Sequence, residues 1–440
     1  MSICRNDVRN WFLVCMVCAA SSFCFGQSES SAPRPLPRCQ EPLDLDSKKL
    51  PLALSAAQSG DSDAACLVGF AYHYGFGVKQ SDEESAKWLL KSASAGLPLA
   101  ENELGYLYEH GSGVPQSDAL AIKWYRAAAD QGLATGQNNL GYMYYTGRGF
   151  ETRNYAQAAT LFAEAAKQGL AAAEFNLGGL YDTGRGLPQD FKLAMEWYSK
   201  SADQGFAAAK TSLGLMYLRG EAVNRDYDRA AALFQSSAEQ GDASGESCLG
   251  YMYARGYGVR RDYAAAFKWT TTAAERGIAS AEANLAYLYE HGFGTTRNPQ
   301  EAVKWHLAAA SKGVSASQNT LGVYLTQGTL LPKDYTQAAQ WFRKAADQGH
   351  VAAQVNLGIL YAKGLGVPLD YIQAYLWFSL AAKAGSRQAK TAIKTISTVM
   401  TPVQLADAKL RASTLVTKTQ PASVPSDNPE MSTLATDATP

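Results

Sequence analysis

The 440-residue chain has no excess of either charge, because 40 Lys and Arg side chains balance 40 Asp and Glu side chains. A protein that binds nucleic acid by neutralising phosphates needs a surplus of cations, so we predict no nucleic-acid partner. The balance also gives no long-range attraction toward acidic partners or membrane surfaces. The hydrophobic fraction of 47% nevertheless suffices for a large core, so most of the chain should fold.

Motifs of known catalytic chemistry are missing. The sequence has five histidines and no H-E-x-x-H, paired C-x-x-C, G-x-S-x-G or Gly-rich loop that ends in Lys-Ser/Thr. His110 and His291 occupy equivalent positions in repeats five apart and cannot converge on one site. We therefore predict no catalytic residue, no metal ligand and no cofactor, and a protein that is not an enzyme.

Cysteines are few and irregularly spaced. Four of the seven lie in the first 26 residues, which leaves Cys39, Cys66 and Cys248 in the rest of the chain. An odd number without regular spacing is not a disulfide framework. A bridge between Cys39 and Cys66 is one alternative and two free thiols are the other, whereas Cys248 is expected to be a small packed residue.

Only one apolar run stands out. Residues 11–25 follow Arg5 and Arg9 and are too few to span a bilayer, which is typical of a signal peptide over residues 1–26. We expect export to the periplasm or the medium, with an uncleaved signal anchor as the alternative, and no membrane span after cleavage. Residues 27–49 are predicted to be a Pro-rich linker, and residues 416–440 a disordered tail.

The organising feature between these ends is a repeat of 36 residues. A Leu-Gly pair or close variant, called the anchor here, recurs nine times, and one interval is 37 residues instead of 36. A Tyr or Leu follows four residues after each anchor leucine or valine, and a Gly follows after seven. The anchors begin at Val68, Leu104, Leu140, Leu177, Leu213, Leu249, Leu285, Leu321 and Leu357.

Each repeat is predicted to form two helices. Small, Leu and Tyr residues at i, i+4 and i+8 around the anchor make one apolar stripe on the first helix, which should end at the following Gly. Seven of the second helices should begin after an Asp or Asn cap, among them Asp190, Asp226 and Asn298. We expect their buried residues to be a small Ala, a Trp such as Trp197, and a later Ala. Trp197→Ala should then lower stability by about 3–5 kcal/mol.

The sequences "AENELGYLYEHGSGV" and "NLGILYAKGLGVPLDYIQAYLWFSLAAKAG" resemble the Sel-one-like repeat (SLR) family, a relative of the tetratricopeptide repeat. The resemblance covers about residues 50–385. It implies an all-α fold, a right-handed superhelical α/α solenoid of about nine 36-residue helix-turn-helix repeats with helical caps. We assign a capping helix to residues 50–60, the nine repeats to residues 61–385 and capping helices to residues 386–415. Thr401 and Gln404 should cap the last helix.

One surface of the first helices is a candidate partner-binding site. We call it the first-helix face and define it by three positions in each repeat: one before, two after and six after the anchor leucine or valine. These positions lie opposite the buried stripe and should line the concave side of the solenoid. Asn can pair with a peptide backbone, and Tyr offers rigid apolar area with a polar tip. The candidates are Asn139, Asn176, Asn284, Asn356, Tyr106, Tyr142, Tyr251, Tyr287, Arg219 and Arg255.

The resemblance also implies a function, since family members typically assemble or regulate other proteins. We expect an exported, non-enzymatic scaffold or adaptor whose partner is a protein or peptide held on the concave face. One alternative is an envelope enzyme of the penicillin-binding or β-lactamase-like kind, known in a cysteine-rich branch whose regular Cys pair is missing here. Another is a binder of cell-wall glycans or peptides. A second reading of the Asn side chains is that they bridge neighbouring helices.

Overall fold

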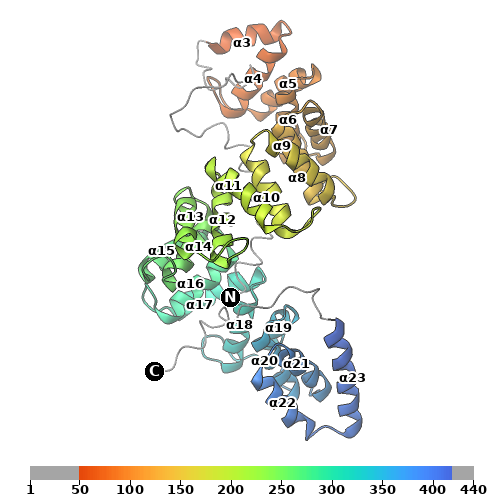
Figure 1. The fold of residues 1–440 in the computed structure, drawn as a ribbon, viewed down its shortest axis with the longest axis vertical. Helices are drawn as coiled ribbons and strands as arrows, with labels where there is room; N and C mark the ends of the chain where they lie inside the picture. The colour runs from red at the N-terminus through yellow and green to blue at the C-terminus, as the bar shows by residue number, and fades with distance from the viewer. Residues whose placement is uncertain (1–48, 419–440) are drawn as a thin grey trace. The chain divides into compact units, whose positions relative to one another are not determined.

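The computed structural model describes residues 49–418, which are helical throughout apart from short turns and contain no strand (Figure 1). The predicted signal peptide, almost all of the predicted linker and residues 419–440 lie outside the described residues. The described chain divides into two compact units, residues 49–226 and residues 227–418. Each unit is a stack of antiparallel helix pairs, so the all-α repeat solenoid is confirmed.

First and second helices alternate through residues 49–226, after an initial helix α3 (Lys49–Gln58). The first helices of repeats one to five are α4 (Ser62–Tyr74), α6 (Pro98–His110), α8 (Ala134–Thr146), α10 (Ala171–Thr183) and α12 (Ala207–Arg219). The second helices of repeats one to four are α5 (Asp82–Ser94), α7 (Asp118–Asp130), α9 (Tyr155–Lys167) and α11 (Phe191–Asp203).

The same alternation runs through residues 227–418. The first helices of repeats six to nine are α14 (Ala243–Arg255), α16 (Ala279–His291), α18 (Ser315–Gln327) and α20 (Val351–Lys363). The second helices of repeats five to nine are α13 (Tyr227–Glu239), α15 (Tyr263–Glu275), α17 (Pro299–Ser311), α19 (Tyr335–Asp347) and α21 (Tyr371–Lys383). Two further helices, α22 (Arg387–Ser397) and α23 (Pro402–Lys418), follow them. Helix α23 therefore includes the first three residues of the predicted tail.

The helix ends follow the predicted capping chemistry. The glycine after each first helix has a left-handed backbone, with φ between 63° at Gly364 and 78° at Gly147. Asp190 and Asn298 accept hydrogen bonds from backbone N–H groups in the first turn of α11 and α17. At α23, the Thr401 N–H donates to the Gln404 side chain and the Gln404 N–H donates back to the Thr401 hydroxyl. These caps satisfy groups that the helix itself leaves unpaired.

The anchor glycine lets the two helices of a repeat pack closely. A Cβ atom added to Gly105 in α6 would lie 2.7 Å from the Tyr125 ring in α7. The corresponding distance is 2.5 Å between Gly322 and the Phe342 ring. Real Cβ atoms do not approach other atoms so closely, so a larger residue would push the helices apart. The side chain that occupies this space is the residue directly after the Trp position.

The prediction that the second helix buries the residue at the Trp position is only partly right. Trp88 and Leu161 are buried, whereas Trp197, Trp341 and Trp377 are partly buried and pack against the core. Trp197 is half-buried, whereas the next residue, Tyr198, is only 1% exposed. Trp341 and Phe342 show the same division. Several of these Trp rings make a cation–π contact with a lysine of the same helix. The Lys200 ammonium, for example, lies 4.0 Å from the centre of the Trp197 ring. One helical step of 100° therefore separates the core position from the half-exposed one.

Neighbouring repeats are held at their loops. A Cβ atom added to Gly113, in the loop of repeat two, would lie 2.2 Å from the backbone of Asp82 at the start of α5. The residue before such a glycine contacts the same preceding helix, as Phe293 does by stacking on Tyr263 with ring centres 4.7 Å apart. Glycine suits Gly113 because its φ is 68° and the loop touches backbone, which cannot move aside.

The two helices after the last repeat do not form another hairpin of the same kind. Both α22 and α23 pack on α21, and α22 continues the row of first helices beside α20. Its outer side is basic, with Arg387, Lys390 and Lys394 exposed. A polar outer side closes the end of a stack that would otherwise present an apolar face. No helix within residues 49–418 is both long and apolar enough to cross a membrane.

These core positions predict unequal effects of two neighbouring substitutions in α19. Phe342→Ala should lower the free energy of unfolding by about 3–5 kcal/mol, because a nearly fully buried ring leaves a cavity beside Gly322. Trp341→Ala should lower it by clearly less, because that side chain is only partly buried. Urea unfolding followed by circular dichroism measures both. Equal losses in the two variants would show that the core position has been misidentified.

Candidate functional site

Three asparagines of the first-helix face donate hydrogen bonds to asparagines of the preceding first helix. The side-chain amide of Asn139 donates to the side-chain oxygen of Asn102 at 3.0 Å. The side-chain amide of Asn176 donates to the side-chain oxygen of Asn138 at 2.8 Å. The Asn356 amide donates in the same way to Asn319, at 3.0 Å. In each pair the donor lies one residue before its anchor, and the acceptor two residues before the preceding anchor. This asparagine seam joins α6 to α8, α8 to α10 and α18 to α20.

The seam changes the role of the predicted asparagines. Asn176 has no exposed area, so a partner cannot reach it in this conformation. Asn139 and Asn356 are half-buried and already bonded within the stack. The bridging interpretation of the sequence therefore describes Asn139, Asn176 and Asn356. Asn284 is half-buried, and it is the candidate asparagine for which we retain a binding role.

Three of the four candidate tyrosines are half-buried, and the fourth is covered. Tyr106 and Tyr287 each pack against the histidine one turn later, with ring centres 4.1 Å apart in both cases. Tyr251 lies near Tyr257, with ring centres 6.2 Å apart. Tyr142 is only 7% exposed, and burial together with the nearby Glu109 raises the pKa of its phenol. Tyr142 therefore belongs to the packing between repeats.

The two candidate arginines have different surroundings. Arg219 forms an ion pair with Glu221, with 3.4 Å between nitrogen and oxygen. Arg255 lies over the rings of Tyr251 and Tyr257, with its guanidinium carbon 5.9 Å from each ring centre. Burial acts to lower the pKa of Arg255, but hydrogen bonding to Tyr251 and the neighbouring phenols raise it above its usual value. Arg255 is therefore a permanent cation in an aromatic setting.

A pocket of about 450 Å³ opens on the first-helix face at the end of the repeat stack. It lies between α20 and α22, above Phe378 of α21. Its walls include positions that define the face: Ile359 and Lys363 stand two and six residues after the anchor of repeat nine. The remaining lining residues are Ala362, Gln388, Thr391, Ala392, Thr395 and Ile396. No pattern in the sequence predicted this pocket, because it depends on where α22 stops continuing the repeat.

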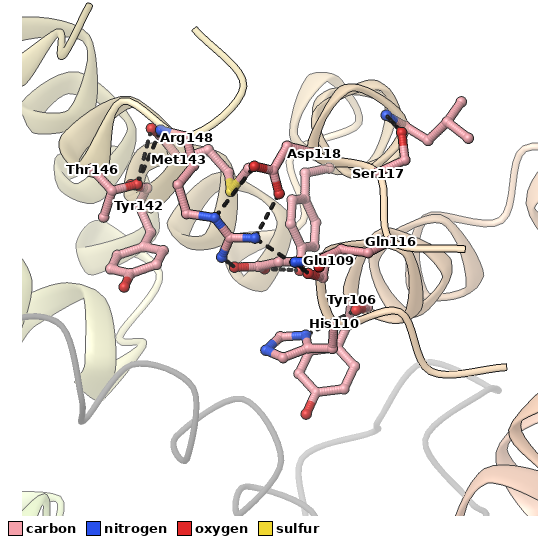
Figure 2. A network of polar contacts seen from close by, with 12 residues as sticks. Tyr106, Glu109, His110, Gln116, Ser117, Asp118, Tyr142, Met143, Thr146 and Arg148 are labelled. Atoms are coloured by element: carbon pink, nitrogen blue, oxygen red, sulfur yellow. Dashed lines mark hydrogen bonds and ion pairs between the residues drawn. The ribbon is translucent and has the colours of Figure 1, made fainter. Parts of the chain in front are cut away.

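A buried charged cluster links repeats two and three (Figure 2). The Glu109 carboxylate, in a residue 6% exposed, accepts from the Tyr125 hydroxyl and the Arg148 guanidinium, at 2.7 Å in each case. Arg148 also pairs with Asp118 at 2.5 Å. Figure 2 shows the Arg148 guanidinium pointing between the two carboxylates. Every strong donor is paired within the cluster, which makes it a structural clamp between loop and helix.

A second polar cluster resembles a Ser-His-Glu arrangement but cannot act as one. His306 Nδ1 lies 3.0 Å from the Ser317 hydroxyl, and His306 Nε2 lies 3.8 Å from the Glu290 carboxylate. Hydrogen bonding to His306 lowers the pKa of Glu290. Ser317 has no exposed area and His306 only 6%, so no substrate reaches the hydroxyl. A nucleophile must be accessible, and this cluster therefore belongs to the core.

The two clusters follow a pattern in the sequence that we did not use. The residue five after the anchor is acidic in repeats two, four and seven, namely Glu109, Asp182 and Glu290. In those same repeats the residue after the Trp position is Tyr125, Tyr198 or His306, which can donate a hydrogen bond. Comparing these two positions repeat by repeat would have found both clusters. Within residues 49–418, no group of three or more His, Cys, Asp or Glu side chains is placed to hold a metal ion.

Comparisons with known proteins agree with this architecture. A family model described as Sel1 repeat matches nine segments, residues 62–97, 98–133, 134–170, 171–206, 207–242, 249–278, 279–314, 315–350 and 351–386. The chain is similar to the structure of a Sel1 repeat protein from Oxalobacter formigenes. Identity is 32%, with 56% of this chain and 96% of the other covered and a TM-score of 0.51.

A second similar structure is a protective antigen present in uropathogenic Escherichia coli strains, described as displaying an SLR fold. It is 32% identical over 88% of this chain and 92% of its own, with a TM-score of 0.49. A search of curated proteins gives no significant match.

The Glu109 clamp predicts a non-additive pair of substitutions. Arg148→Met should lower stability by about 2–4 kcal/mol, because it leaves a buried carboxylate without its cation. Adding Glu109→Gln should restore more than half of the loss, because the amide oxygen can still accept from Tyr125 and carries no charge. Thermal unfolding of the single and double variants measures this coupling. Strictly additive losses would contradict the clamp.

Glu103 predicts a pH dependence of stability. Burial raises the pKa of its carboxyl from 4.5 to about 7, although the Asn102 amide donates to it at 3.1 Å. The folded state then binds the proton more tightly than the unfolded state does, so this group lowers stability as the pH rises from 4.5 to about 7. Glu103→Gln should stabilise the protein at pH 8 but hardly at pH 4. Melting temperatures across this range test it, and a stabilisation independent of pH would contradict it.

Proposed function

Because this chain belongs to the Sel1 repeat family, we propose that it is an exported, non-enzymatic scaffold that binds a protein or peptide on the first-helix face. Sel1 repeats form helical scaffolds of a kind consistent with protein–protein interaction. One observation carries the proposal. Half-buried aromatic and cationic side chains occupy these positions on the neighbouring first helices α14 and α16, and an apolar pocket opens beside two of the same positions on α20. Binding sites combine apolar concavity with a few placed polar groups.

The set of binding residues that we propose is smaller than the set of candidates from the sequence. Tyr106, Tyr251, Tyr287, Asn284 and Arg255 keep accessible area on the first-helix face. Asn139, Asn176 and Asn356 serve the asparagine seam, Tyr142 is covered, and Arg219 is neutralised by Glu221. Tyr and Arg are the residues that contribute most binding energy at protein interfaces, so the loss of most asparagines leaves the proposal intact.

The burial of the one Ser-His-Glu cluster supports the non-enzymatic part of the proposal. Export is supported by the state of a single cysteine. Cys66 is disulfide-bonded, and disulfides persist in oxidising compartments such as the periplasm or the extracellular medium. Its predicted partner, Cys39, lies outside the described residues. Cys248 is buried, as expected of a small packed residue.

A capture experiment tests the proposal. Tagged protein recovered from the cell envelope or medium should retain a specific protein, which mass spectrometry identifies, and recovery from the cytoplasm alone would contradict export. Tyr251→Ala with Tyr287→Ala, on neighbouring helices α14 and α16, should weaken binding of the purified partner at least tenfold, because two rigid contact surfaces are lost.

The matched control is Leu120→Ala with Leu307→Ala, which removes exposed apolar side chains from second helices and should leave binding unchanged. Equal losses in both pairs, or turnover of a chromogenic β-lactam by the wild-type protein, would contradict the assignment.

A further inference from the structure

The first-helix face of residues 227–418 lacks acidic side chains. Among its twelve positions on α14, α16, α18 and α20, none is Asp or Glu, while two are the basic residues Arg255 and Lys363. The twelve residues are Cys248, Tyr251, Arg255, Asn284, Tyr287, His291, Thr320, Val323, Gln327, Asn356, Ile359 and Lys363. A face with cations and no anion favours a negatively charged partner, although the chain as a whole is neutral.

The two ends of this face offer different contacts. At α14, Arg255 lies over the rings of Tyr251 and Tyr257, and Tyr227 stacks on Tyr257 with ring centres 4.5 Å apart. A carboxylate bound there would meet a guanidinium whose surroundings are partly dry, where charge-assisted hydrogen bonds are strong. At α20, the pocket lined by Ile359, Phe378 and Ile396 is mainly apolar, and Lys363 forms part of its wall. That end suits an aliphatic side chain.

The spacing of the helices limits the partner's shape. Three steps along the first helices separate α14 from α20, and packed helices lie about 10 Å apart, so the two ends are roughly 30 Å apart. An extended chain advances about 3.3 Å per residue, so roughly nine residues would span this distance. Asn284 and Gln327 stand between the ends and can pair with an extended backbone. Two cations are too few for the phosphate contacts of a nucleic acid.

We propose that residues 227–418 bind an extended acidic peptide segment, with an aliphatic side chain in the pocket between α20 and α22 and a carboxylate at Arg255. The inference rests on the proposed function and names the class of partner for the same face. The aliphatic anchor and the carboxylate are about nine residues apart in the peptide.

Selection from a phage-displayed library of random twelve-residue peptides tests the partner class. The purified protein should enrich peptides with a net negative charge and an aliphatic residue seven to ten positions from a carboxylate. Synthetic copies should bind with an affinity that falls as salt rises. Enrichment of neutral or basic peptides on this face would overturn the inference.

Charge reversal then tests the location, with fluorescence anisotropy as the readout. Arg255→Glu with Lys363→Glu should weaken an enriched peptide at least tenfold, and Ala392→Phe, which fills the pocket, should weaken it at least fivefold. The matched control is Lys390→Glu with Lys394→Glu, which makes the same change in net charge on exposed residues of α22 outside the pocket. Equal loss in both charge-reversed pairs would overturn the inference, provided that the melting temperatures match.

The outcomes separate the inference from the proposed function. Suppose that enriched peptides bind Tyr251→Ala more weakly than wild type but bind both charge-reversed pairs as tightly as wild type. The first-helix face would then remain a binding site, and the inference of an acidic partner would be wrong. If no peptide were enriched, or if every enriched peptide bound Tyr251→Ala with Tyr287→Ala as tightly as wild type, both would fail.

Discussion

The close contact between the anchor glycine and the residue after the Trp position is the constraint on which most of the repeats depend. At Gly105, Gly178 and Gly322 the missing side chain leaves room for a ring of the second helix. Because the ring lies against backbone, the spacing of the two helices is set by the ring itself and not by a pair of flexible side chains. The same spacing then recurs from repeat to repeat, so the loops and first helices of neighbouring repeats meet at equivalent points.

The contacts between repeats use one geometry with several chemistries. The loop residue eight after the anchor is Arg148 in repeat three, where it pairs with Asp118, and Phe293 in repeat seven, where it stacks on Tyr263. In repeat four it is Arg185, which lies over the Tyr155 ring at 5.6 Å. An ion pair, a ring stack and a cation–π contact thus replace one another at the same place. Each pair must be matched, so a change in one partner leaves the other unsatisfied.

The asparagine seam and the half-buried tyrosines occupy equivalent positions of the repeats but differ in accessibility. Where both partners are Asn, as with Asn138 and Asn176, the side chains bond to each other and leave the surface. Tyr251 and Tyr287 keep accessible area on the same face, and no acidic residue shares that face within residues 227–418. Net charge alone hides this arrangement, because the acids are placed elsewhere on the repeats. The position of charges within the repeat therefore carries more information about partners than their sum.

The sequence by itself determined the repeat, the helix pairs and their ends, because glycine caps, Asp and Asn caps and apolar periodicity act within a few residues of one another. It also placed the first-helix face, from helical geometry alone. Only the tertiary structure decided which residues of that face are accessible. Asn176, for example, is buried and bonds to Asn138 of another helix, 38 residues earlier in the chain. The tertiary structure likewise decided that Tyr198, and not Trp197, fills the core, and that a pocket opens beside α22. These outcomes depend on packing between helices. A periodic pattern specifies the repeat length, but it does not specify which residues of a neighbouring helix each position contacts.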